Sequence, residues 1–193
     1  MAGLGLLAAS CAGSDSATPT PTTTSSVPST SGATSGTGPE TTSPATSTTA
    51  VPAEEEIVAR YLGFWDARLA ANSGTPDPDD PALAEFATGE QLQTVIAETR
   101  RRREEGLALR AAEPSRTEHI VTVVSRSGDR AELQDCFVND GVVYRVATGE
   151  VVDDSVVTRN VLAVMVKVDG LWKLQRASVV QEWEGVAGCA GAR

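Results

Sequence analysis

The order of the predicted secondary structure is the strongest constraint on the fold of this chain. Helical patterns occupy residues 52–106, and every element predicted after Gly106 is a strand. Helices followed by a run of strands indicate an α+β fold and exclude a parallel sheet of βαβ units. Asp169-Gly170, between two β-rich segments, predicts a two-residue type I′ hairpin. We therefore expect N-terminal helices packed on one curved antiparallel sheet.

The first predicted helix runs from about Pro52 to Ala71. Glu54, Glu55 and Glu56 suit the positive end of its dipole, and Asn72-Ser73-Gly74 ends it. The centre of its buried stripe is expected at Val58, Leu62, Trp65 and Leu69, widened by Ile57, Tyr61 and Phe64.

Two shorter helices follow. Asp80 is expected to cap a helix that begins at Pro81 and ends at Phe86. Thr88-Gly-Glu-Gln91 matches a capping box that opens the third helix, and Gly106 ends it. Its inward residues are expected to be Leu92, Val95, Ile96 and Thr99.

The strands are predicted from β-branched, apolar segments separated by turn residues. They are expected at residues 107–111, 118–126, 130–138, 142–147, 156–168 and 171–181.

A low-complexity segment precedes this domain. More than half of residues 14–50 are Ser or Thr, and most of the others are Pro, Gly or Ala. Such a segment has too little apolar surface to offset the entropy of ordering its backbone, so we expect it to be disordered. The predicted organisation is a stalk at residues 12–53 and a folded domain at residues 54–193.

Cys11 stands at the junction of an apolar segment and the stalk. Residues 1–10 are uncharged and end in small residues, which is typical of a bacterial lipoprotein signal with Cys11 as the lipidated residue. This predicts an extracytoplasmic protein anchored to the outer face of the membrane through acyl chains. A signal sequence normally begins with Lys or Arg, so we interpret Met1 as a late start. The alternative is a cytoplasmic N-terminus in which Cys11 is an ordinary thiol.

Several short motifs of the domain are shared with one family. They are Asp135-Cys136, Ala147-Thr148-Gly149-Glu150, the segment 169–174 and Gly188-Cys189. On these motifs, residues 54–193 resemble the NTF2-like (cystatin-like cone) domains of secreted and lipid-anchored actinobacterial proteins. The resemblance implies a fold and an envelope location. It implies no single activity, because this cone hosts isomerases, dehydratases, binding modules and assembly domains.

Cys136 and Cys189 are the two cysteines of the predicted domain. In an oxidising envelope two such cysteines are expected to pair, and the resemblance supports a bond from the C-terminal tail to a central strand. Two separate buried thiols are the alternative. Zinc is not expected, because these cysteines and the distant His119 do not complete a ligand shell.

Composition and motifs disfavour several function classes. The chain has a formal net charge of −10, which disfavours nucleic acid as a partner. No nucleophile elbow, phosphate loop or dinucleotide motif is present, so neither a cofactor nor a catalytic residue is predicted. His119, the single histidine, is interpreted as a surface or satisfied core residue.

Two charged clusters also receive structural interpretations. The segment 100–103, four consecutive arginines, is expected to be a solvated helix end, with docking to an anionic polymer or lipid as the alternative. Asp77, Asp79 and Asp80 are interpreted as turn and capping residues, because their spacing lacks the glycine and distal glutamate of a calcium loop.

The resemblance also implies a cavity between the first helix and the concave face of the sheet. Its expected lining residues are Tyr61, Trp65, Asp135, Tyr144 and Arg159. The leading hypothesis is a non-catalytic binding or assembly module. The alternative is a cavity that binds a small hydrophobic ligand or, rarely, isomerises it, with Asp135 as base and a tyrosine stabilising the oxyanion. A third hypothesis is an interaction domain of an envelope complex.

Substitution of Cys11 tests the anchor. The Cys11→Ala variant is expected to appear in the medium with its fold intact, because an acidic domain has little electrostatic affinity for anionic lipid. Cell fractionation and circular dichroism of the released protein are the measurements. A variant that stays in the membrane fraction would contradict lipidation at Cys11.

Overall fold

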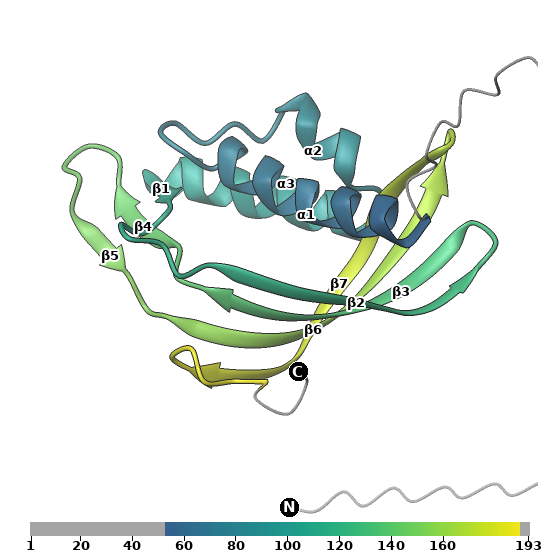
Figure 1. Ribbon diagram of the computed structural model, residues 1–193. Coiled ribbons are helices and arrows are strands. Elements are labelled where there is room, and N and C mark those ends of the chain that lie inside the picture. Colours follow the sequence, from purple (N-terminus) through teal and green to yellow (C-terminus); the bar gives the residue numbers. More distant parts are fainter. Residues whose placement is uncertain (1–52, 190–193) are drawn as a thin grey trace, which may run out of the picture. The chain divides into compact units, whose positions relative to one another are not determined.

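The computed structural model describes residues 53–189 (Figure 1). Cys11 and the predicted stalk, except for its last residue, lie outside the described residues. Within the described part, no helix is both long and apolar enough to cross a membrane.

Three helices are followed by strands, as predicted, and cover one face of a curved sheet (Figure 1). The helices are α1 (Ala53–Ala71), α2 (Pro81–Phe86) and α3 (Gly89–Glu105). The strands are β1 (Leu107–Arg110), β2 (Glu118–Ser127), β3 (Arg130–Asn139), β4 (Val142–Arg145), β5 (Val151–Asp153), β6 (Val157–Val168) and β7 (Leu171–Glu184). All the predicted elements are present, and β5 is an addition. The α+β fold class is therefore confirmed.

The strands form two antiparallel sheets, so the expectation of one sheet was wrong. The larger sheet has the order β2-β3-β6-β7 and the smaller one β1-β4-β5. The chain leaves the larger sheet after Asn139, where the buried Asp140 carboxylate accepts hydrogen bonds from the Ser115 and Thr117 hydroxyls and the Arg116 NH. Burial alone would raise the pKa of Asp140, but these hydrogen bonds outweigh it and hold the pKa below its usual value. These bonds fix the break between the sheets.

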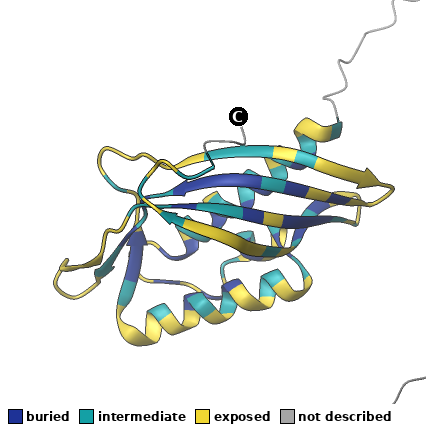
Figure 2. Cartoon of the chain, turned by 90° about the horizontal axis from the view of Figure 1, so that it is seen from below, coloured by how far each residue is buried: buried dark blue, intermediate teal, exposed yellow. Residues whose placement is uncertain are grey.

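The hairpin between β6 and β7 follows the predicted turn chemistry. Asp169 has φ 52° and Gly170 has φ 82°, so both central residues are left-handed, as a type I′ turn requires. Figure 2 shows that buried residues concentrate in the middle strands of the larger sheet, whereas exposed residues follow the loops and the outer faces of the helices.

The buried face of α1 is centred on different residues from those predicted. Ile57, Tyr61 and Phe64 are fully buried against the sheet. The residues predicted as the centre of the stripe are half-buried: Val58, Leu62, Trp65 and Leu69. Leu62, Trp65 and Leu69 line a cavity, which is why they keep some exposure, and the first two also pack against the core.

Of the three signals predicted for α2 and α3, two are confirmed. The Asp80 side chain accepts a hydrogen bond from the Ala82 NH at the start of α2, and Gly106 ends α3 in a left-handed conformation with φ 66°. The capping box is wrong, because the Thr88 side chain makes no capping bond. Gln91 instead accepts a hydrogen bond from the Ala177 NH on β7, 2.9 Å away, and so joins α3 to the sheet.

The predicted disulfide between Cys136 and Cys189 is present, with the two Cα atoms 6.0 Å apart. It fixes the segment after β7 to the outer face of β3. The tail packs closely there, since a Cβ atom added to Gly188 would lie 2.6 Å from Thr158 and Trp183.

Removal of this disulfide tests its contribution to stability. The bond closes a loop with a sequence separation of 53 residues, so the Cys136→Ala/Cys189→Ala variant is expected to lose about 2–5 kcal/mol of unfolding free energy. Urea denaturation measures the loss, and reduced wild-type protein is the matched control. Equal stability of the oxidised wild type and the variant would contradict a stabilising tail bond.

Candidate functional site: a cavity with an aromatic wall and a charged end

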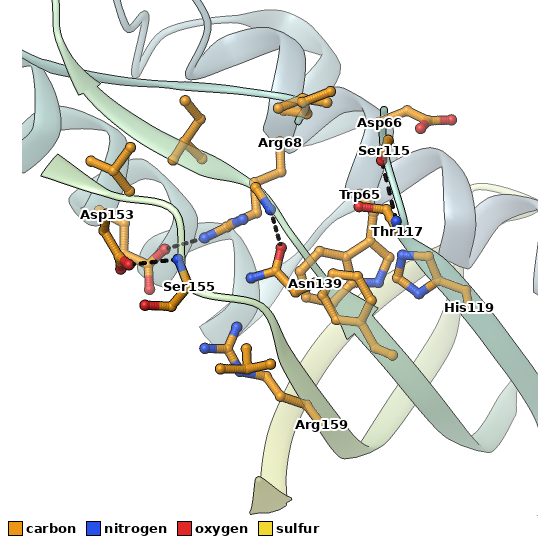
Figure 3. Close-up of a pocket in the computed structure, with 18 of the residues that line it drawn as sticks. Trp65, Asp66, Arg68, Ser115, Thr117, His119, Asn139, Asp153, Ser155 and Arg159 are labelled. Atoms are coloured by element: carbon orange, nitrogen blue, oxygen red, sulfur yellow. Dashed lines mark hydrogen bonds and ion pairs between the residues drawn. The ribbon is translucent and has the colours of Figure 1, made fainter. Parts of the chain in front are cut away.

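A cavity of about 810 Å³ lies between α1, α3 and the inner face of the sheets. This volume falls in the usual range of small-molecule sites. The lining includes Trp65 and Arg68 from α1, Arg102 from α3, and His119 and Phe137 from the larger sheet. Figure 3 shows that Trp65 and His119 lie together on one side, whereas Asp153, Ser155 and Arg159 lie on the other side of Asn139.

The first end of the cavity is an aromatic wall, made of Trp65, His119 and Phe137. The imidazole of His119 stacks on Phe137 with ring centroids 4.0 Å apart and an interplanar angle of 11°. The centroid of the Trp65 ring lies 4.9 Å from that of Phe137 and 5.6 Å from that of His119. Three flat side chains held in this way form a rigid surface on which an apolar, planar group can pack.

The aromatic wall rests on a buried carboxylate. Asp135 is fully buried on β3, and its Oδ2 atom accepts a hydrogen bond from the Tyr61 hydroxyl at 2.9 Å. The Nδ1 atom of His119 lies 2.7 Å from the same oxygen. Burial, and then the negative charge of Asp135, raises the pKa of Tyr61, so the phenol stays a neutral donor. When Nδ1 of His119 carries the proton, Nε2 is left as the other functional atom of the ring.

The charged end of the cavity adjoins this wall and consists of Arg68, Glu98 and Arg102. Glu98 Oε2 lies 3.3 Å from Arg68 Nη2 and 3.7 Å from Arg102 Nη1. Arg102 also donates to the buried side chain of Asn72 at 3.0 Å. Burial, and then the nearby positive charge of Arg68, lowers the pKa of Arg102. Two guanidinium groups thus share one carboxylate.

Two further charged residues of the cavity, Arg159 and Asp153, make polar contacts near its surface. Arg159 Nε lies 2.6 Å from Glu182 Oε2. Asp153 is exposed and accepts a hydrogen bond from the Ser155 NH at 2.9 Å. Hydrogen bonds from Ser155, followed by the charge of Arg159, lower the pKa of Asp153. No group of three or more His, Cys, Asp or Glu residues is arranged to hold a metal ion between residues 53 and 189.

The five expected lining residues occupy three kinds of position. Trp65 and Arg159 line the cavity. Tyr61 and Asp135 are buried behind the aromatic wall, where Asp135 contacts His119 and the Tyr61 ring lies edge-on to Trp65. Tyr144 is not among the lining residues of the described part, and its hydroxyl accepts a hydrogen bond from the Gly74 NH at 3.2 Å.

Sequence reasoning missed His119 and the charged end. His119 was interpreted as a surface or core residue, and Asn72 as a helix stop. A usable signal was present on the first helix, because Trp65, Arg68 and Asn72 follow the spacing i, i+3, i+7 and so share one face. Arg102 was hidden among four consecutive arginines, three of which are exposed.

Comparison with known proteins gives a fold and no family. No protein-family model matches the chain. No curated protein matches it either. Among solved structures it resembles the intermembrane space region of the chloroplast protein ARC6, with a TM-score of 0.50 and 17% identity over 63% of this chain and 91% of that chain.

Two further solved structures of unknown function have lower TM-scores. A protein with a cystatin-like fold from Nostoc punctiforme has a TM-score of 0.37 and 11% identity, covering 63% of this chain and 88% of that one. An NTF-2 like protein from Silicibacter pomeroyi has a TM-score of 0.37 and 15% identity, covering 68% and 98%.

Removal of one donor from Asp135 tests its role as the support of the aromatic wall. Tyr61→Phe deletes a hydrogen bond to a buried carboxylate and is expected to lower the unfolding free energy by about 1.5–3 kcal/mol. The matched control is Tyr144→Phe. The Tyr144 hydroxyl accepts a hydrogen bond from the exposed Gly74 NH, and its removal is expected to lower the unfolding free energy by less than about 1 kcal/mol. Urea denaturation measures both. Equal losses in the two variants would contradict the role given to Tyr61.

Proposed function

We propose that this chain is a membrane-anchored, extracytoplasmic lipoprotein of actinobacterial type, and that its folded domain is a non-catalytic binding module. The cavity is the ligand site. The observation that carries this proposal is the aromatic wall of Trp65, His119 and Phe137 inside a cavity of about 810 Å³. Trp65 and Phe137 offer apolar area on which a ligand can pack, and neither side chain is a nucleophile, an acid or a base.

The sequence around Cys11 and the disulfide of the domain support the proposed extracytoplasmic location. The apolar segment before Cys11 and the Ser/Thr-rich stalk after it are typical of a lipid-anchored protein. The Cys136–Cys189 disulfide is consistent with an oxidising compartment outside the cytoplasm. The stalk would hold the domain away from the bilayer, where its cavity is open to ligands of the envelope.

Binding is favoured over catalysis because the acidic groups at the site are already engaged in hydrogen bonds or ion pairs within the domain. Asp135 is fully buried and joins Tyr61 to His119, so it has no direct access to a ligand. The acid of the charged end, Glu98, is already shared between two arginines. The cavity as described therefore recognises a ligand by shape and charge.

Acid–base catalysis is the second candidate, and the His119–Asp135 pair is the observation that favours it. A carboxylate that orients Nδ1 leaves Nε2 of the imidazole to take or give a proton. In that case His119 would be the catalytic residue and Asp135 the residue that positions it.

Protein purified from its own envelope tests the binding proposal. Native mass spectrometry is expected to show a bound small molecule in the wild type and its loss in Trp65→Ala, which removes the centre of the aromatic wall. Leu162→Ala is the control, since Leu162 is exposed on the opposite face of the sheet. A wild type that carries no small molecule, or a Trp65→Ala variant that keeps it, would contradict the cavity as the ligand site.

The same ligand separates binding from catalysis. The non-catalytic proposal predicts that the ligand is recovered unchanged after incubation with the wild type, as followed by mass spectrometry. Conversion by the wild type that is lost in His119→Gln would establish the second candidate in its place.

A further inference from the structure

We propose that the charged end of the cavity binds a carboxylate, so that the ligand is a small organic acid with a flat, apolar body. This inference rests on the proposed function, because it names the ligand class of the same cavity. Arg68 and Arg102 would hold the acid group, and the aromatic wall would hold the body.

The first step is the balance of charge at that end. Arg68 and Arg102 share the single carboxylate of Glu98. Arg101, the other arginine near Arg102, is paired with Glu105 at 3.3 Å and adds no free negative charge. One positive charge is therefore left without a partner among these groups.

The second step is burial. The side chain of Arg102 is only 12% exposed and that of Arg68 is 25% exposed. Removing a charge from water is costly unless an opposite charge compensates it. The other acids that line the cavity, Asp66 and Asp153, are exposed, so water screens their effect. The charged end thus favours an added anion.

The third step is the rigidity of this end. Asn72 is fully buried and accepts a hydrogen bond from Arg102 through its side-chain oxygen. Its side-chain NH₂ group donates to the backbone oxygen of Arg68 at 2.8 Å and to the Thr99 hydroxyl at 3.0 Å. The Asn72 carbonyl accepts from the Leu109 NH at 2.8 Å. Arg102 is thereby held in place before a ligand arrives, which lowers the entropic cost of binding.

The fourth step is the distance between the two ends. The guanidinium group of Arg68 lies over the Trp65 ring, with its carbon 5.7 Å from the ring centre, so the charged end adjoins the aromatic wall. One small molecule therefore reaches both the charged end and the aromatic wall. Among anions, a carboxylate on a flat body fits best, because its two oxygens match the planar donor pair of a guanidinium group.

Calorimetric titration of the detergent-solubilised full chain tests the inference with two probes, 2-naphthoate and its uncharged analogue 2-naphthamide. The acid is expected to bind about tenfold more tightly than the amide, as a charge-assisted contact implies. Arg102→Gln is expected to abolish this preference, so that the acid and the amide bind with similar affinities. Arg101→Gln removes the same charge from the exposed side of the same helical turn and is expected to have no effect.

A gain of affinity gives a test that misfolding does not mimic. Glu98→Gln removes the carboxylate that competes for both arginines, so the acid is expected to bind about 5–10-fold more tightly and the amide equally well. Equal affinities for the two probes in the wild type, or no gain with Glu98→Gln, would overturn the inference and leave the proposed function standing. Failure of both probes to bind would overturn the inference together with the aromatic wall as a binding surface.

Discussion

The buried carboxylate of Asp135 is the constraint on which the rest of the site depends. Burying a carboxyl group is costly unless it has polar partners, and Tyr61 and His119 both contact the Oδ2 atom of Asp135. These two partners come from α1 and β2, so one atom on β3 fixes the helix and the edge strand relative to the sheet. The aromatic wall follows from this arrangement, since His119 stacks on Phe137, two residues after Asp135.

Successive side chains of a strand point to opposite faces of a sheet, so residues 135–137 of β3 make contacts on both faces. Asp135 and Phe137 point inward, toward α1 and the cavity, whereas Cys136 points outward and bonds Cys189. The C-terminal tail is thus fixed behind the residues that form the aromatic wall. On β6, Asn160 pairs with Cys136, and the Thr158 hydroxyl, two residues earlier, donates to the Gly185 carbonyl at 2.7 Å, so the tail holds β6 as well. The disulfide on the outer face of the sheet therefore restrains the strand that carries the buried Asp135 carboxyl group on the inner face.

Features set by local chemistry were predictable from the sequence, and features set by distant contacts were not. The order of elements, the Asp169-Gly170 turn, the Asp80 cap and the Gly106 stop depend on neighbouring residues alone. The division into two sheets depends on Asp140 and residues 115–117, more than twenty positions away. The position of His119 depends on a register that the sequence does not show. A regular register continued from the Ser127–Arg130 pair would place His119 opposite Val138. A bulge between Val123 and Ser125 shifts the register by one residue, so that His119 pairs with Phe137.

The first helix shows why a packed core and a cavity are difficult to separate from a pattern. Its apolar residues cover more than one face, and periodicity alone does not indicate which face meets the sheet. The polar residues are more informative. Arg68 and Asn72 share a face with Trp65, where a closed core would place apolar side chains. A guanidinium group on such a face is stabilised by an opposite charge or by contact with water. Glu98 contacts both guanidinium groups, so positive charge exceeds negative charge on this face, which is the property that the proposed ligand site uses.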